Sequence, residues 1–567
     1  MASTAANPQT QPETVKDTLI SIVIAFALAF VFRGFVVEAF VIPTGSMAPT
    51  LMGAHIRVRN PESGNSWPIE PWNAPVAAAS GVYSSVQGSP KQPVTVNDPL
   101  TGQLQTRSNL PLMAGDRILV LKYLYSIMNP QRFDVIVFKN PENPTENYIK
   151  RLIGLPGEEI ALVDGDVFVR TGGIPSGQSD RNHWSQDGWQ IARKPRVVQN
   201  ATWQTVFDSS FTPPPPNSFS PPWTSQQAGW KLSDTTSYTY SGTPRTELVF
   251  DQTRIRFTDP LMLPAPGADP PRLDRREYWN IDDRYAYNET PRTDFQLFSR
   301  FPVSDIRLRA GIEPQAEGLI AEALLTIRGY EFRVRIDGPK ATLSRRPAPG
   351  AVPDSSVPAE WETLAQGDVP ALTPGRVTDV ALWHADQAIG VEIDGKPVFE
   401  TWTYDWSPSQ RILQATGRSV EDILASGTNR ARNPFQDGRM YRRPDVRWAF
   451  EGAPLRLHRV SLERDLHYQP AEDRGTQRGA ARSTSPSHPL VLTSDQFFAC
   501  GDNSPASLDC RLFSSTNDWV SQQFDNTIGV IPRELLLGRA FFVYWPSLHK
   551  GSGFIPAPDF GRMRFIW

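Results

Sequence analysis

Cysteine is almost missing from this chain of 567 residues, which contains only Cys500 and Cys510. No CxxC pair occurs, so a zinc ribbon and a disulfide framework are both excluded. The two thiols either pair with each other or stay free and buried, and their number leaves both states open. The chain also lacks an excess of positive charge, since its formal net charge is −3. The composition therefore gives no basis for a nucleic-acid partner.

Histidine is scarce and lies outside any catalytic motif. The chain has 7 histidines, and none belongs to a recognisable Ser-His-Asp arrangement. His55 follows a serine-containing segment, but it sits beside a Gly/Ala turn where an exposed side chain is the simpler interpretation. A serine nucleophile in this chain would therefore need a different base.

Long apolar runs are absent except for one near the N-terminus. Residues 19–32 carry no charge, and after Arg33 and Gly34 the apolar character continues to Ile42. The whole stretch 19–42 is long enough to span a bilayer if Arg33 snorkels. The alternative is a cleaved signal peptide with an A-x-A site at residues 27–29. That site lies inside the apolar run, so we expect an uncleaved transmembrane helix, whose nearly balanced flanking charges do not set its orientation.

The remaining sequence predicts a mainly β protein with a large insertion. The 53 prolines and 39 glycines indicate many turns and few long helices. We expect a polar tail at 1–18, a catalytic core at 43–170 with a loop-rich insertion at 53–114, and a second core segment at 489–567. Between the core segments, 171–488 forms an insertion.

Alternating runs in the insertion predict a β-sandwich over about 235–468. Examples are Tyr330–Ile336 and Leu455–Leu462, and Asp-Gly pairs at 337–338 and 394–395 mark turns. The pattern Val391–Phe399, a strand, a turn and a second strand, resembles laminin-G and concanavalin-like jelly rolls. Its ligand is not readable from the sequence.

Three segments carry residues with catalytic chemistry. Ser46 follows Gly45 in a turn directly after the apolar stretch, where glycine permits conformations closed to other residues. Lys150 lies inside an apolar strand, and a buried lysine with a lowered pKa can act as a base. In the third segment, Asp509 and Arg511 would share one face of a strand and could pair. Each alone has an ordinary interpretation: a surface turn, a solvated strand residue and a surface ion pair.

Together these segments resemble the conserved boxes of the bacterial signal peptidase I family. The resemblance rests on residues 35–51, 115–120, 132–138 with 148–158, 498–511 and 538–545, in the family's order. It covers about 200 residues, divided between the two ends of the chain. A Ser/Lys dyad serine endopeptidase, without metal or cofactor, is what the resemblance implies.

The resemblance also implies a role for each matching residue. Ser46 would be the nucleophile and Lys150 the general base, with the Ser46 N–H and the Thr44 hydroxyl forming the oxyanion hole. Ser507 would orient Lys150, and Asp509 with Arg511 and Arg151 would brace that strand. The expected substrate pockets are lined by Phe40, Ile42, Leu51, Val137, Tyr148 and Ile149.

We therefore expect a peptidase of the cytoplasmic membrane, with its catalytic domain on the extracytoplasmic side. Its partners would be the lipid bilayer and exported preproteins with A-x-A-like sites. Two alternatives stay open: a specialised protease whose insertion selects a narrow substrate set, and a carbohydrate-binding or adhesion protein on a degenerate peptidase scaffold. We expect a deletion of about 175–485 to leave cleavage of a simple reporter intact.

Overall fold

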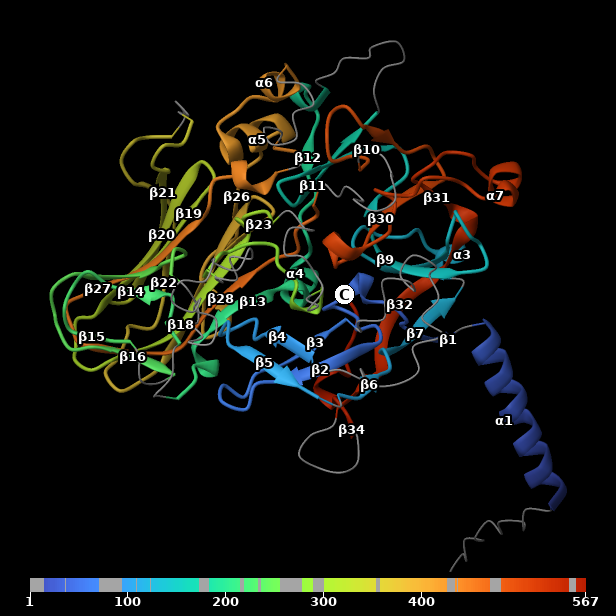
Figure 1. The fold of residues 1–567 in the computed structure, drawn as a ribbon, viewed down its shortest axis with the longest axis horizontal. Helices are drawn as coiled ribbons and strands as arrows, with labels where there is room; N and C mark the ends of the chain where they lie inside the picture. Colours follow the sequence, from blue (N-terminus) through green and yellow to red (C-terminus); the bar gives the residue numbers. More distant parts are fainter. Residues whose placement is uncertain are drawn as a thin grey trace, which may run out of the picture.

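The chain folds mainly as antiparallel β-sheet in this computed structural model, with two β-rich bodies side by side and α1 projecting from one of them (Figure 1). The structure describes residues 15–35, 37–70, 94–108, 110–122, 124–172, 183–214, 219–232, 236–254, 278–288, 300–352, 357–425, 434–435, 437–469, 481–549 and 557–567. The first 14 residues of the expected polar tail lie outside the described residues.

A seven-stranded antiparallel sheet joins the two ends of the chain. Its strand order is β1-β7-β32-β8-β9-β30-β31. The strands are β1 Val37–Val41, β7 Arg117–Lys122, β32 Leu536–Trp545, β8 Val135–Lys139, β9 Asn147–Gly154, β30 Gln496–Cys500 and β31 Ile531–Pro532. Strand β32 lies between β7 and β8, so the C-terminal segment completes the sheet that the N-terminal segment begins. The short helices α3 Leu124–Ile127 and α7 Asp518–Gln523 belong to the same body.

The apolar stretch before Ser46 changes from helix to strand, which corrects the expected helix over 19–42. Helix α1 covers Val15–Phe35, and β1 begins at Val37 and pairs with β7 from Val37↔Leu121 to Val41↔Arg117. Gly34 is a poor helix former, and the pairing with β7 satisfies the backbone of β1. Within the described residues, no helix has both the length and the apolar composition that crossing a membrane requires.

The segment 53–114 is more regular than the predicted loop-rich insertion. Strands β2 His55–Arg59, β3 Ser66–Ile69 and β6 Leu112–Met113 form one small sheet, and β4 Val94–Asn97 pairs with β5 Leu104–Arg107. The alternating residues of β2 and β3 bury Ile56, Val58, Trp67 and Ile69 in a common apolar cluster. This burial, rather than the turn-rich composition, decides the local structure.

A third sheet connects the core to the insertion. Its order is β12-β11-β10-β29, with β12 Gln190–Ile191, β11 Asp166–Thr171, β10 Glu158–Val163 and β29 Leu490–Val491. Phe168 of β11 packs in one apolar cluster with Trp184 and with Ile412 of α5 Pro408–Thr416. The insertion therefore packs against the core through apolar side chains, in addition to its two chain connections.

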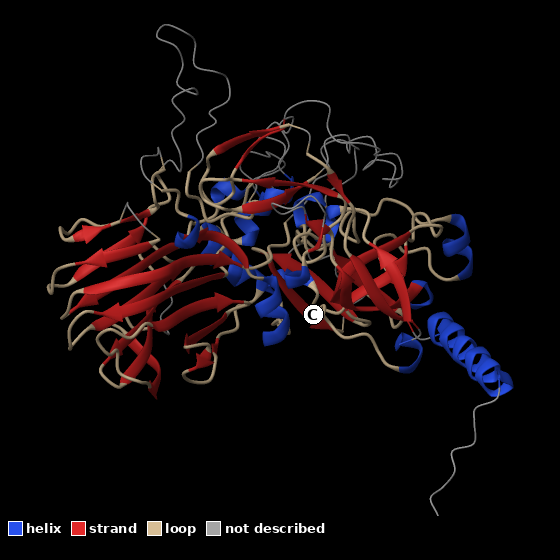
Figure 2. Ribbon diagram, turned by 90° about the horizontal axis from the view of Figure 1, so that it is seen from below, coloured by secondary structure: helices blue, strands red, loops and turns tan. Residues whose placement is uncertain are grey.

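The insertion contains two large antiparallel sheets that share one apolar core (Figure 2). The first contains β15 Trp230–Lys231, β16 Ser237–Tyr240, β28 Leu455–Arg464, β18 Ile306–Pro314, β23 Thr378–Ala385, β24 Ala388–Ile393 and β25 Lys396–Pro397, with β13 Gln204–Asp208 and β26 Trp402–Thr403 beside them. The second contains β14 Trp223–Thr224, β17 Thr246–Phe250, β27 Asp445–Glu451, β19 Ile320–Ile327, β20 Tyr330–Asp337, β21 Lys340–Pro347 and β22 Glu362–Asp368. The helices α4 Arg196–Thr202, α5 and α6 Val420–Ala425 lie outside these sheets.

These two sheets form the β-sandwich expected from the alternating runs, but the sandwich begins earlier. β13, β14 and β15 all precede residue 235, the expected start. At the predicted turn 337–338, Asp337 is the last residue of β20 and the turn residues are 338–339. The other predicted turn is present: Asp394 and Gly395 both have positive φ, 50° and 75°, and connect β24 to β25. Such a two-residue turn matches the twist of the flanking strands, which explains the Asp-Gly pair.

Candidate active site

Ser46 lies on a short 3₁₀ turn, Gly45–Met47, that follows β1, and Lys150 lies on β9. Lys150 Nζ donates a hydrogen bond to Ser46 Oγ at 2.8 Å and another to the Ile149 carbonyl at 3.1 Å. Both side chains are nearly enclosed, with 9% of Ser46 and 4% of Lys150 exposed. The structure thus brings the predicted nucleophile and base into direct contact across 104 residues of sequence.

Burial tunes Lys150 for proton transfer. The loss of solvation lowers the pKa of Lys150 to about 8, and the charge of Asp509 opposes this only in part. In the described part of the chain, no carboxylate forms an ion pair with this ammonium group, because Asp509 is bound by Arg511 with contacts of 2.9 and 2.8 Å. A lysine with this pKa has a substantial neutral fraction near neutral pH.

Asp509 and Arg511 form a buried pair below the dyad, as their spacing suggested. Burial by itself would raise the pKa of Asp509, but the charge and hydrogen bonds of Arg511 hold the pKa below its ordinary value. Asp509 also accepts a hydrogen bond from the Gly501 N–H at 2.9 Å. Arg511 reaches the insertion through the Gln469 carbonyl at 2.9 Å. The pair therefore fixes the loop that follows β30.

Arg151 forms a separate buried ion pair. Its guanidinium binds Asp502 rather than Asp509, through Nε–Oδ1 at 2.8 Å and Nη2–Oδ2 at 2.7 Å, and both side chains are fully buried. The Thr50 hydroxyl also donates to Asp502, at 2.5 Å. Asp502 is a residue of this site that the sequence analysis did not single out. Its position in the Gly501–Asn503 segment was the available signal.

Ser507 and Thr44 lie close to the dyad in different ways. The Ser507 side chain is buried beside Gly501 and makes no hydrogen bond to Lys150 among the described residues, so its expected orienting contact is missing here. Thr44 is half-buried, and its Oγ1 lies 3.5 Å from Ser46 Oγ.

Most of the predicted pocket residues gather around Ser46. One apolar cluster contains Ile42, Leu51 and Val137, which are buried, together with the half-buried Phe40 and Ile149. Tyr148 belongs to the neighbouring cluster, and its ring centroid is 5.0 Å from Lys150 Nζ. Phe40 and Ile149 are partly exposed to solvent, and the buried residues of the cluster pack against them.

The insertion also reaches this site. Tyr285 Oη donates to the Asp502 carbonyl at 2.6 Å, and Tyr287 Oη donates to the Ala54 carbonyl at 2.8 Å. A cavity of about 420 Å³ separates this segment from the loop after Ser46, lined among others by Met52, Tyr285 and Tyr287. No local pattern in the sequence predicts these contacts between distant segments.

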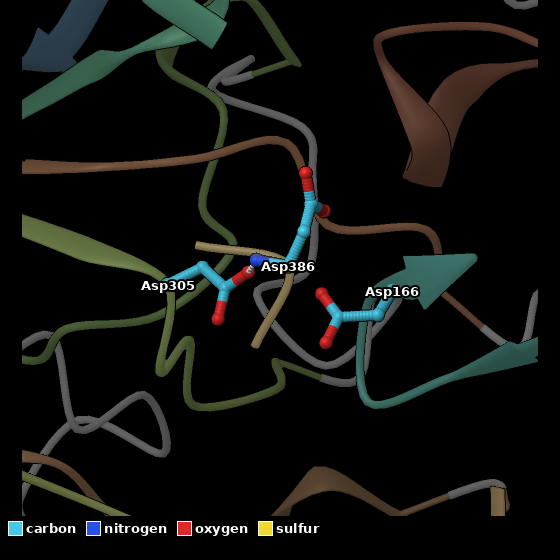
Figure 3. Close-up of side chains that lie close together, drawn as sticks. All are labelled: Asp166, Asp305 and Asp386. Atoms are coloured by element: carbon cyan, nitrogen blue, oxygen red, sulfur yellow. Dashed lines mark hydrogen bonds between the residues drawn. The ribbon is translucent and has the colours of Figure 1, made fainter. Parts of the chain in front are cut away.

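A buried acidic cluster lies further away, at the junction of core and insertion (Figure 3). Carboxylate oxygens of Asp166, Asp305 and Asp386 all lie within 4.8 Å of one another, a donor set that hard cations favour. Protein cations already occupy this position: Arg411 is 3.1 Å from Asp166 and 3.5 Å from Asp305, and Lys194 is 2.5 Å from Asp386. Burial raises the pKa of Asp166, and Arg411 opposes that rise. The cluster is an electrostatic link between the two bodies.

The comparisons with known proteins each cover part of the chain. A family model described as "Signal peptidase, peptidase S26" matches residues 103–205, which include Lys150. Signal peptidase I of Buchnera aphidicola subsp. Baizongia pistaciae is 42% identical over 71 residues, 10% of this chain and 23% of that protein. Signal peptidase I of Rickettsia bellii (strain OSU 85-389) is 26% identical over 188 residues, 33% of this chain and 49% of that protein.

The chain thus spans less than half the length of either relative. Among solved structures, carbohydrate binding module CBM66 from Bacillus subtilis aligns over 43% of this chain and 96% of its own, at 6% identity and a TM-score of 0.21. A TM-score this low supports no inference about a ligand of this chain. Residues 103–205 of this chain, with Lys150 on β9, match the peptidase S26 signal peptidase family.

Proposed function

We propose that this protein is a serine endopeptidase that cleaves exported preproteins after A-x-A-like sites with a Ser46–Lys150 dyad. The observation that carries the proposal is the enclosed 2.8 Å contact between Lys150 Nζ and Ser46 Oγ, with a lysine pKa of about 8. A carboxylate in direct contact would keep the lysine protonated, and among the described residues none forms an ion pair with Lys150, whose Nζ lies 5.0 Å from the centroid of the Tyr148 ring. An enclosed, apolar environment of this kind lowers the pKa of a lysine and so makes it a better general base than a solvated lysine.

The reaction follows from the positions of these groups. Neutral Lys150 accepts the hydroxyl proton as Ser46 Oγ attacks the scissile carbonyl carbon. The carbonyl oxygen becomes an oxyanion, which the Ser46 N–H and the Thr44 hydroxyl stabilise. The C–N bond then breaks, Lys150 gives its proton to the leaving amine, and an acyl-enzyme remains. Water, deprotonated by Lys150, hydrolyses the ester and frees Ser46.

The apolar cluster beside the dyad supports a preference for small side chains. Ile42, Leu51 and Val137 are at most 3% exposed and fill the space under the half-buried Phe40 and Ile149. A shallow apolar surface of this kind fits alanine better than a large residue. Helix α1 ends two residues before β1 and exposes apolar side chains such as Leu19, Val23 and Phe26. We propose that these contact lipid and hold the site near a membrane on its extracytoplasmic side.

The direct test is cleavage of a preprotein reporter by the purified full-length chain in detergent. We expect a single cut after the A-x-A site, identified by mass spectrometry, and no cut by Ser46→Ala. Ser515→Ala, a serine with an exposed hydrogen bond to Glu142, is the matched control and should cleave normally. Cleavage by Ser46→Ala at the wild-type rate would refute the proposal.

A second candidate, a protease specialised by its insertion, is favoured by the contact between Tyr287 and the loop after Ser46. The cavity of about 420 Å³ lies at this contact and could admit substrate residues beyond the scissile bond. The same assay with several preproteins separates the two candidates, because a general peptidase would process most of them and a specialised one would process few.

The pH dependence of kcat/KM provides an independent prediction. The base must be neutral, and burial lowers the pKa of Lys150 to about 8, so activity should rise with pH through about 8 and level off above it. At pH 7 roughly one tenth of the molecules would hold a neutral Lys150. A pH–rate profile on a substrate without titratable groups near the cut checks this. A midpoint near ~10, the value of a solvated lysine, would contradict the assigned base.

A further inference from the structure

The 3₁₀ turn Gly45–Met47, which carries Ser46, also packs against residues of the insertion. The Tyr287 ring lies directly against Gly45, where a Cβ atom would come within 1.9 Å of Tyr287 Cε1. Tyr287 is 4% exposed and packs with Ala48 and Met52 of the same loop. The 3₁₀ turn that carries Ser46 is therefore covered by a residue 242 positions away in the sequence, and Gly45 leaves the space that this contact needs.

Asn288, the next residue, reaches the turn through Asn503. The two side-chain amides form a reciprocal pair: Asn288 Nδ2 donates to Asn503 Oδ1 at 2.7 Å, and Asn503 Nδ2 donates to Asn288 Oδ1 at 2.6 Å. Asn503 Nδ2 also donates to the Gly45 carbonyl at 3.0 Å, and the Asn503 N–H donates to the Ser46 carbonyl at 3.0 Å. Asn503 thus binds both carbonyls that flank the Ser46 backbone, with its amide plane held by Asn288.

The Gly45 carbonyl and the Ser46 N–H belong to one peptide group. Because that group is planar and trans, its C=O and N–H point in opposite directions. A hydrogen bond that holds the Gly45 oxygen therefore also sets the direction of the Ser46 N–H. That N–H is the proposed oxyanion donor, and such donors contribute only when they are aligned before the reaction.

We infer that Asn288 is a positioning residue for this catalytic site: through Asn503 it aligns the Ser46 N–H with the developing oxyanion. The inference rests on the proposed peptidase function. It also assigns the insertion a part in catalysis without placing any of its side chains on the reacting atoms. Loss of Asn288 would leave Ser46, Lys150 and the pocket residues in place, so substrate binding and the pKa of the base should change little.

The test compares Asn288→Ala and Asn288→Asp with wild type, in the full-length protein and with the preprotein reporter. Removing an oxyanion donor outright costs ~10²–10³ in kcat, so a misaligned donor in Asn288→Ala should lower kcat roughly 10- to 100-fold. KM should stay within about twofold and the pH midpoint should stay that of wild type. Asn288→Asp still accepts from Asn503 but cannot donate to it, and should give an intermediate kcat.

Asn200→Ala on α4 is the matched control, since it makes the same change at an exposed position of the insertion and should keep the wild-type kcat. A kcat for Asn288→Ala within about twofold of wild type, or a loss that appears in KM instead, overturns the inference. If Ser46→Ala is inactive in the same series, that result leaves the proposed function standing. If Ser46→Ala cleaves normally, the proposed function itself fails.

Discussion

Lys150→Arg is expected to abolish peptidase activity, with a fall of at least ~10⁴-fold in kcat/KM. Arginine keeps its proton at any working pH, so it cannot accept the hydroxyl proton of Ser46. Its longer, planar head group also cannot fit the enclosed space in which Lys150 is only 4% exposed. Lys150→Met should be equally inactive although it fits the apolar surroundings, because it has no basic nitrogen.

The measurement is single-turnover cleavage of a preprotein reporter, with folding checked by circular dichroism. Lys139→Arg on the adjacent strand β8 is the matched control, since Lys139 only donates to the Pro144 carbonyl at 3.3 Å. A folded Lys150→Arg protein that retains activity within about tenfold of wild type would show that another group is the base.

The largest effect on stability is expected for Arg411→Met at the junction of core and insertion. Arg411 is fully buried and lies 2.8 Å from Asp164 and 3.1 Å from Asp166 of the β10–β11 hairpin, and 3.5 Å from Asp305 of the insertion. Without the guanidinium, these carboxylates keep their burial and lose their counter-charge. Breaking a buried ion pair in this way costs about 3–5 kcal/mol of unfolding free energy.

Urea unfolding followed by tryptophan fluorescence checks this prediction, through a lower midpoint of the transition. Arg309→Met is the control, because the Arg309–Asp379 pair lies in the same insertion with 46% of the arginine side chain exposed. An exposed pair contributes at most ~1 kcal/mol. Equal midpoint shifts in the two variants would mean that the acidic cluster does not join the two bodies.

These contacts revise the expected behaviour of an insertion deletion. The sequence suggested that removing about 175–485 would spare a simple peptidase, because no nucleophile–base pattern occurs there. The deletion would remove Tyr287 from Gly45, Asn288 from Asn503 and Arg411 from Asp164. We now expect it to lose stability and kcat together.

The sequence by itself was enough to predict the contact between Ser46 and Lys150 and the Asp509–Arg511 pair, because the short segments that carry them together resemble the boxes of one family. Alternation likewise predicted β20 and β28, since the period of a strand is a local property. The tertiary structure decided the rest. Arg151 pairs with Asp502 across 351 positions and Asn288 with Asn503 across 215, and the stretch after Gly34 becomes a strand by pairing with β7. Which partners meet, and which groups lose their solvent, depends on packing between distant segments, and no local pattern contains that information.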